Sequence, residues 1–358
     1  MDKIETLLKE LTEADGVSGY ENDVRAILRR HFEPLGEISQ DKLGSLICKK
    51  SGAAAAPRVL LAGHMDEIGF MVRLVTKEGF IRFTPLGGWP SQVLPAQMVT
   101  IHTDKGAVLG VIGSKPPHLM GDEERKKLVD RKELFIDIGA TSQKEVEAAG
   151  VRVGDPVVPL SRFAIMDVTP KTYIAKAFDD RVGNALTIGV LQALGKTHPN
   201  TVFGVATVQE EVGVRGATTS VEAVNPDVAI ILEVDIAGDV PGIKLEESAI
   251  KMGGGPTVLA YDARMIPNIK LRNLVIDTAA DLKIPLQLSA MEGGATDGSA
   301  VHLHKTGVPT VVISVPTRHI HSHNSIMRRQ DYDAALKLAT AVVRKLDKDT
   351  VAALTAWQ

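Results

Sequence analysis

"RVGNALTIGVLQALGKTHPNTVFGVATVQEE", residues 181–211, joins a helix-like stretch to a strand-like stretch and ends in two adjacent carboxylates. The spacing of apolar residues predicts a helix over 181–196, and the apolar run over 201–208 predicts a buried strand. The same alternation of helix and strand continues toward the C-terminus. It predicts an α/β fold, a three-layer αβα sandwich around a mostly parallel central sheet. Glu210 and Glu211 would then lie at the carboxyl edge of that sheet.

A different pattern occupies residues 69–165. Apolar and polar residues alternate there around glycine-containing turns, as in "VTIHTDKGAVLGVIG" at 99–113, and this pattern is typical of antiparallel hairpins. We therefore expect a β-rich, barrel-like domain inserted into an α/β domain. The α/β domain would be discontinuous and would comprise residues 1–68 and 166–358.

The composition excludes several classes of protein. The 358 residues carry a net charge of -3, which gives no electrostatic reason to expect nucleic acid or an anionic membrane as a partner. A single cysteine, Cys48, excludes a disulfide within the chain and a thiolate metal cluster, so a metal site would need histidine and carboxylate ligands. The N-terminus lacks the apolar core of a signal peptide and no run is long enough to span a membrane, so we expect a cytoplasmic protein.

Acidic and histidine residues follow nearly every predicted strand of the α/β domain. Ligands of open α/β sheets bind beyond the carboxyl ends of the strands, so these residues are expected to converge. They are His64 and Asp66, Glu210 and Glu211, Glu233 and Asp235, then His319, His321 and His323, with Asp179 and Asp180 just before a helix. Any one of them is more simply a solvated loop residue or a helix cap. Together they are the imidazole and oxygen ligands that suit zinc, manganese or cobalt.

The number of ligands favours two ions rather than one. Two histidines with three carboxylates exceed what one tetrahedral ion with an open position needs, but they suit two ions that share a carboxylate. Two-metal sites lower the pKa of a water and polarise a substrate carbonyl. Of Glu210 and Glu211, one would neutralise a cation and the other would shuttle a proton, and the spacing does not decide which.

Six motifs, in order along the chain, resemble those of the tetrahedral aminopeptidases, the glutamyl aminopeptidase and endoglucanase-like family of dinuclear metallopeptidases. The motifs are "AGHMDEIG" at 62–69, "AFDDRVG" at 177–183, "QEEVGVRGA" at 209–217, "LEVDIAGD" at 232–239, "GGATDGSAVH" at 293–302 and "TRHIHS" at 317–322. The resemblance therefore covers essentially the whole chain.

The resemblance implies roles for individual residues. His64 and Glu233 would bind the first ion, Glu211 would bind the second, and Asp180 would be the carboxylate that bridges the two. From the spacing alone, Asp179 could replace Asp180. The same resemblance makes His321 a metal ligand, Glu210 the general base and Asp66 the carboxylate that orients His64.

Two histidines depart from the family pattern. His319 stands where the family often has tyrosine, and His323 where it often has proline, so the departures concern the nearby pocket rather than the ligands. His31 and His102 lack acidic neighbours in the sequence and are left outside the site. Thr296 and Asp297 could cap the helix that follows them or contact substrate, and the cap is at least as good an interpretation.

The resemblance implies a metal-dependent aminopeptidase that hydrolyses N-terminal residues from short peptides. It implies two divalent ions per subunit, with zinc as the expected metal and cobalt or manganese as alternatives. It also implies that the β-rich insertion forms a homo-oligomer, a dimer that can extend to a tetrahedral dodecamer. A glycoside hydrolase would leave His64 and His321 unused and has few aromatic residues available for sugar stacking. A non-catalytic, metal-dependent assembly protein would not need the spare carboxylate of Glu210.

Overall fold

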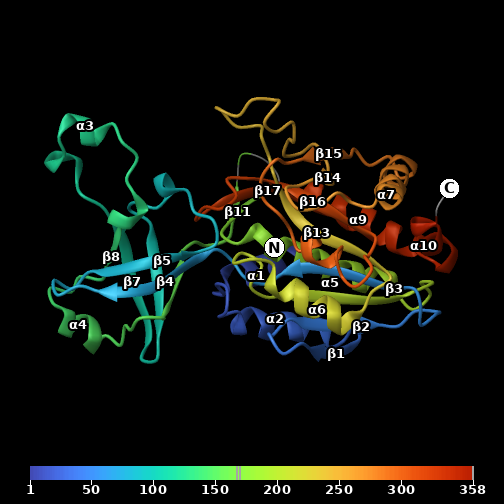
Figure 1. The fold of residues 1–358 in the computed structure, drawn as a ribbon, viewed down its shortest axis with the longest axis horizontal. Coiled ribbons are helices and arrows are strands. Elements are labelled where there is room, and N and C mark those ends of the chain that lie inside the picture. The colour runs from blue at the N-terminus through green and yellow to red at the C-terminus, as the bar shows by residue number, and fades with distance from the viewer. Residues whose placement is uncertain (167, 169–170, 357–358) are drawn as a thin grey trace.

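The computed structural model describes residues 1–166, 168 and 171–356. It consists of a body, in which helices pack on a large mixed sheet, and a closed β-barrel beside it (Figure 1). The barrel lies at the left of Figure 1, and the C-terminal helices lie at the opposite end of the body. Among the described residues, no helix combines the length and apolar character that a membrane crossing requires.

Four parallel strands form the centre of the sheet, in the order β12-β3-β13-β16. Their bounds are β3 (Arg58–His64), β12 (Thr201–Thr207), β13 (Val228–Ile236) and β16 (Thr310–Arg318). Nearly every residue of these strands is buried, which explains why their sequences are continuous apolar runs rather than alternating ones. Because the strands are parallel, their carboxyl ends meet at one edge.

Most pairings at the flanks of the sheet are antiparallel, so the prediction of a mostly parallel sheet is correct for the centre and not for the whole sheet. On one side β12 pairs with β2 and β2 with β1, and on the other β16 is followed by β17, β11 and β10. Strand β14 pairs antiparallel with β16 and parallel with β15. The bounds are β1 (Glu37–Gln40), β2 (Leu46–Lys50), β10 (Ala164–Met166), β11 (Thr172–Ala175), β14 (Thr257–Tyr261), β15 (Gln287–Ala290) and β17 (Ser325–Arg328). Short connections make antiparallel hairpins of β1–β2, β10–β11 and β16–β17, whereas the other antiparallel pairs join strands that are far apart in the sequence.

Alternate residues of the central strands contribute to two separate cores. In β3, Val59 and Leu61 belong to one core, whereas Leu60 and Ala62 belong to the other. The first core includes residues of α1 (Lys3–Glu13), α2 (Asn22–Phe32), α5 (Phe178–Leu194), α7 (Ile269–Asp281), α9 (Arg329–Lys345) and α10 (Lys348–Thr355). The second includes residues of α6 (Arg215–Val224) and α8 (Gly298–Val301). The sheet is therefore buried on both faces.

The barrel closes in the order β4-β5-β8-β7-β6-β9 and has its own core, which contains Phe70, Trp89 and Ile136. Its strands are β4 (Gly69–Val75), β5 (Ile81–Leu86), β6 (Met98–Thr103), β7 (Gly106–Gly113), β8 (Phe135–Asp137) and β9 (Pro156–Pro159). Short helical segments connect them: η1 (Ser91–Val93), η2 (Pro117–Leu119), α3 (Asp122–Arg125), η3 (Arg131–Glu133) and α4 (Gln143–Ala148). The chain enters the barrel immediately after the carboxyl end of β3, so the barrel adjoins the ligand-binding edge of the sheet.

Candidate metal centre and active site

A cavity of about 840 Å³ opens at the carboxyl edge of the parallel strands. Most of the predicted site residues line it. These are His64, Glu210, Glu211, Glu233 and His321, and Asp179 lines it as well. Residues separated by more than 250 positions in the sequence are thus brought to one place by the parallel sheet.

His64 is the last residue of β3, and its side chain is only 2% exposed. Its Nδ1 lies 2.9 Å from the backbone oxygen of Asp66. Because a carbonyl only accepts, Nδ1 carries a proton and Nε2 faces the cavity, 2.9 Å from Oδ1 of Asp179. Burial by itself lowers the pKa of His64, but Asp179 and Asp66 outweigh it and raise the pKa well above its ordinary value.

His321 is oriented in the same way from the opposite side of the cavity. Its Nδ1 donates a hydrogen bond of 2.7 Å to the backbone oxygen of Gly88, which follows strand β5 of the barrel. Its Nε2 lies 3.3 Å from Oδ2 of Asp179 and 3.6 Å from Oε1 of Glu211. Burial opposes protonation, yet Asp179 and Glu211 raise the pKa of His321 to about 9. Both histidines therefore present Nε2 to the same carboxylate.

Asp179, rather than the predicted Asp180, lies between the two histidines. One Asp179 oxygen faces His64 and the other faces His321. The neighbouring Asp180 is fully buried, and its carboxylate accepts the backbone N–H groups of Gly183 at 2.8 Å and His64 at 3.1 Å. The prediction differs from the structure because both aspartates have non-helical backbone angles at the start of α5, and these angles turn the two side chains in different directions.

Asp66 supports the turn that carries the two glutamates. Its buried carboxylate accepts the backbone N–H groups of Glu210 at 2.9 Å and Glu211 at 3.2 Å, and also the hydroxyl of Ser18. The contact with His64 runs through the Asp66 backbone oxygen, whereas the carboxylate Oδ1 is 3.6 Å from Nδ1. The carboxylate of Asp66 thus fixes the direction of Glu210 and Glu211 more directly than that of His64.

The cavity holds more buried negative charge than the protein compensates. Burial raises the pKa of Glu210 and Glu233 well above their ordinary value and that of Glu211 to about 8. Burial also opposes ionisation of Asp179, but His321 and His64 lower its pKa. A further sign is that Oε1 of Glu211 is buried without a hydrogen-bond partner in the described part of the chain. Carboxylates that are buried without counter-charges are expected where cations bind.

Three groups of ligand atoms have the spacing of metal ligands, with all atoms of a group within 4.8 Å of one another. They are His64, Glu210 and Glu211; His64, Asp179 and Glu233; and Asp179, Glu211 and His321. Asp179 and Glu211 each belong to two of these groups. The donor set, imidazole and carboxylate, is one that zinc, cobalt and manganese accept, so the residues fit a divalent metal site.

The sequence did not indicate a second set of charges beside the site, in which three residues are buried and Asp15 is partly exposed. The Lys176 ammonium lies 2.6 Å from Oε1 of Glu67 and 3.1 Å from Oδ1 of Asp15, and the fully buried Arg181 lies 3.5 Å from the same Glu67 oxygen. The signal in the sequence was the occurrence of Lys176 and Glu67 within apolar stretches. We call these four residues the balanced cluster, because two cations meet two carboxylates.

Asp297 is also buried close to the site. It makes no side-chain cap of the following helix α8. The Thr296 hydroxyl does accept the backbone N–H of Gly298 at 3.2 Å, so the cap interpretation is wrong for Asp297 and confirmed for Thr296. One of its oxygens accepts the Thr207 hydroxyl, and the other has no partner among the described residues. Burial raises the pKa of Asp297 to about 6.

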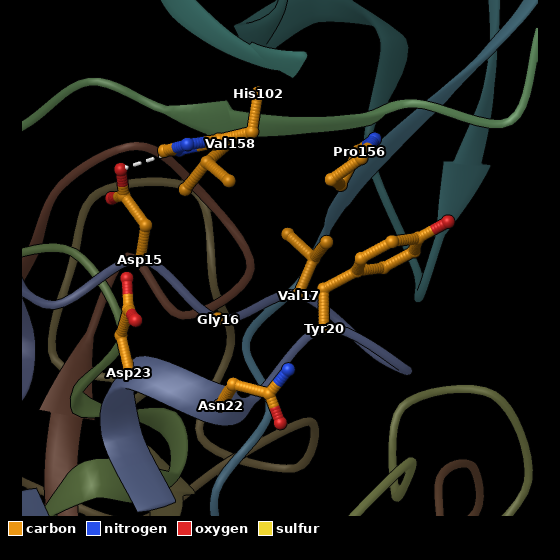
Figure 2. Close-up of a pocket in the computed structure, with 9 residues that line it drawn as sticks. All are labelled: Asp15, Gly16, Val17, Tyr20, Asn22, Asp23, His102, Pro156 and Val158. Carbon is orange, nitrogen blue, oxygen red and sulfur yellow. Dashed lines mark hydrogen bonds and ion pairs between the residues drawn. The ribbon is translucent and has the colours of Figure 1, made fainter. Parts of the chain in front are cut away.

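A smaller pocket of about 180 Å³ lies where the N-terminal segment meets the barrel (Figure 2). Nε2 of His102, from β6, lies 2.8 Å from Oδ2 of Asp15, and Tyr20 closes the other side beside Pro156. His102 therefore has the acidic neighbour that its sequence context did not reveal, as does His31, which contacts Glu10. No predicted site residue lines this pocket, and its histidine joins the body to the barrel.

A model of the M42 glutamyl aminopeptidase family matches residues 44–338, which is most of the chain and includes every residue of the cavity described above. The chain belongs to the M42 family. M42 membership makes it a peptide hydrolase of the aminopeptidase type, and neither a glycoside hydrolase nor a non-catalytic assembly protein is favoured by it.

Curated relatives differ in the residue that they are named for. A glutamyl aminopeptidase of Lactococcus lactis is 34% identical over 96% of this chain and 97% of its own length. A lysyl aminopeptidase of Pyrococcus furiosus is 33% identical over 95% of this chain and 96% of its own. M42 membership therefore does not by itself set the preference for an N-terminal residue.

Solved structures are similar to this protein over nearly the whole chain. A TET aminopeptidase from a marine sediment archaeon (Thaumarchaeota archaeon SCGC AB-539-E09) has a TM-score of 0.96 and 49% identity, and 99% of each chain is covered. The TET1 peptidase of Pyrococcus horikoshii, which can assemble into a tetrahedron or a large octahedral shell, has a TM-score of 0.85 and 30% identity, with 95% of this chain and 99% of that chain covered. The M42 relatives thus include homo-oligomers.

Proposed function

We propose that this protein is a dinuclear metalloaminopeptidase that removes N-terminal residues from short peptides. The observation that carries the proposal is the position of Asp179, whose two oxygens face His64 and His321 from a buried cavity with excess negative charge. M42 membership supports aminopeptidase chemistry. The spacing of the ligand atoms supports the proposal of two ions and of the residue roles given below.

In this proposal His64 and Glu233 would hold one divalent cation, Glu211 and His321 would hold the other, and Asp179 would contribute to both. Asp179 replaces Asp180, which we assign to backbone support of the β3–α5 contact. Zinc suits the ligands best, and cobalt or manganese are also acceptable. Cations bound there would polarise the scissile carbonyl and lower the pKa of a water molecule.

Glu210 is proposed as the general base. It belongs to the group containing His64 and Glu211, its Oε2 lies 4.0 Å from Nε2 of His64, and it lines the cavity. Its carboxylate accepts a proton from the attacking water and returns it to the leaving amine. Asp66 positions Glu210 by accepting its backbone N–H. Burial raises the pKa of Glu210, which favours its acceptance of that proton.

The same cavity gives little support to sugar hydrolysis. None of its described lining residues is a phenylalanine, tyrosine or tryptophan, so a stacking surface for a sugar ring is missing from it. The two histidines would also have no role in a mechanism that uses two carboxylates.

The proposal extends to the organisation of the chain. Residues 1–68 and 166–358 form the catalytic domain, a three-layer sandwich, and residues 69–165 form a dimerisation domain. The barrel exposes large apolar side chains in support of this, among them Leu74, Met98 and Leu109. Dimers of this kind could build the larger assemblies that M42 relatives form.

The test is the isosteric variant Glu210→Gln, assayed on a panel of aminoacyl amides with zinc, cobalt or manganese. We expect kcat to fall by roughly 100-fold or more while the metal content stays at two ions per chain. Glu37→Gln, an equal change at a remote exposed position, should retain kcat. Near-normal turnover by Glu210→Gln would exclude Glu210 as the base.

A further inference from the structure

A second cavity, of about 400 Å³, lies on the outside of the barrel and shares no lining residue with the metal centre. Four basic side chains line it: Arg73 from β4, Arg82 from β5, and Arg131 and Lys132 from η3. We call this cavity the basic pocket. No aspartate or glutamate is among its described lining residues.

Most cations of the basic pocket differ from several other cations on the barrel, which are paired. Lys115, Lys126 and Arg152 each contact a carboxylate. By contrast, the side chains of Arg73, Arg131 and Lys132 make no ion pair or hydrogen bond with another residue in the part of the chain that the structure describes. A concave surface lined by charges of one sign attracts a counter-ion more strongly than the same charges spread over a flat surface.

The pocket is held in place by the fold. Nη1 of Arg82 lies 3.3, 2.9 and 3.0 Å from the backbone oxygens of Lys132, Glu133 and Leu134, so it ties the η3 turn to β5. Arg73 is the additional residue of a β-bulge, because the pairing of β4 with β5 passes from Val72 directly to Leu74. Bulges redirect side chains and occur frequently beside functional sites. These contacts therefore hold the Arg82 side chain and the backbone of the other basic residues in place.

We propose that the basic pocket binds a diphosphate oxyanion. Several guanidinium and ammonium groups around one cavity call for a ligand with more than one negative charge, and arginine forks pair with phosphate oxygens in a bidentate manner. A single carboxylate would leave most of the positive charge uncompensated. The volume lies within the range of small-molecule sites, and Leu74 and Phe83 supply an apolar wall against which an organic group can pack.

The same chemistry could come from inorganic pyrophosphate or from a nucleoside diphosphate, and calorimetric titration distinguishes the two. The metal-loaded protein is titrated with pyrophosphate and, separately, with ADP. ADP that binds about tenfold more tightly than pyrophosphate would indicate that the apolar wall holds an organic group, whereas equal affinities would indicate the inorganic anion. Both results support a diphosphate site.

The site is assigned with the double variant Arg73→Glu/Lys132→Glu, which spares the structural Arg82. We expect it to weaken binding of both probes by at least about tenfold, because two charge-assisted contacts are replaced by repulsion. The matched control is Lys77→Glu/Lys144→Glu, an equal charge change at exposed positions of the barrel outside the pocket. Its affinities should match those of the unchanged protein.

Pyrophosphate bound only at the metal centre would be retained by both double variants, and that result would overturn the proposal. The proposal would also be wrong if no binding is detected, or if Arg73→Glu/Lys132→Glu changes the oligomeric state in a sizing experiment while diphosphate binding is absent. In the latter case the basic pocket faces a second copy of the chain. Aminopeptidase turnover by both double variants checks that they are folded.

Discussion

Two clusters of buried charge adjoin each other in this protein, and they are compensated differently. In the balanced cluster, Lys176 and Arg181 meet Glu67 and Asp15. Burial opposes ionisation of Asp15, yet His102 and Lys176 lower its pKa. At the metal centre, by contrast, burial raises the pKa of Glu211 to about 8 even though His321 is nearby.

The comparison separates structural charge from functional charge. A cluster in which the protein supplies both signs is complete as folded, whereas a cluster with surplus carboxylates requires cations from solution. Removal of a charge should therefore reduce stability in the first cluster and metal binding in the second.

The largest expected effect is on the balanced cluster. Glu67→Gln leaves two buried cations with one carboxylate, and the free energy of unfolding should fall by about 3–5 kcal/mol. Chemical denaturation at pH 7 measures the change. Glu37→Gln, at an exposed strand edge, should alter it by less than about 0.5 kcal/mol. A loss below about 1 kcal/mol for Glu67→Gln would remove the distinction between the clusters.

Metal affinity tests the other side of the comparison. Asp179→Asn should weaken binding of at least one ion by roughly 100-fold or more. Loss of a residue that only supports a metal ligand already lowers metal affinity by about 10–100-fold, and loss of a ligand should cost more. Asp180→Asn should have the smaller effect, since that carboxylate accepts two backbone N–H groups. Competition titrations with a chromogenic chelator measure both variants. The reverse order would restore Asp180 as the bridging residue.

The stability of the metal-free protein should depend on pH because the carboxylates of the metal centre lack counter-charges. Folding raises the pKa of His321 from 6.5 to about 9 and that of Glu211 from 4.5 to about 8. The folded state thus binds more protons than the unfolded state between pH 6.5 and 9, so its stability falls as pH rises through this range. The Tm of chelator-treated protein should be lower at pH 9 than at pH 6.5, and added zinc should reduce this difference. A Tm that increases toward pH 9 would contradict the assigned surplus of carboxylates.

The smallest effect is expected at the contact between body and barrel. His102 and Asp15 are both partly exposed, so His102→Gln should cost about 1 kcal/mol or less. The hydrogen bond that His102 donates to Asp15 raises the pKa of His102, so the contribution of the pair is complete below pH 6.5 and is lost as pH rises through the raised pKa. The difference in unfolding free energy between the unchanged protein and His102→Gln, measured by denaturation across pH 5.5–8.5, gives the contribution of the pair. A difference that grows with pH would show that the pair is not the cause.

The strand-end rule made most of the site predictable. Each central strand appears in the sequence as an apolar run. Because these strands are parallel, polar residues at or near the end of a run lie at the carboxyl edge, which locates His64, Glu211 and Glu233. The rule does not separate Asp179 from Asp180, because adjacent residues differ in direction only through backbone angles that propensity does not encode. The antiparallel flanks and the closure of the barrel depend on pairing between distant strands, which local patterns do not specify. The balanced cluster was not predicted because its residues are far apart in the sequence and meet only in the folded chain.

The hydrogen bond between His321 and the Gly88 carbonyl has a consequence for engineering. A proton on Nδ1 leaves Nε2 free to act as the proposed metal ligand. The Gly88 carbonyl that accepts this proton belongs to the barrel segment, whereas the other proposed ligands come from the body. Excising the insertion, or grafting a foreign one, would release an imidazole to rotate or to exchange tautomers. The two modules are therefore not interchangeable parts, and swaps between homologues should carry the loop after β5 together with its histidine.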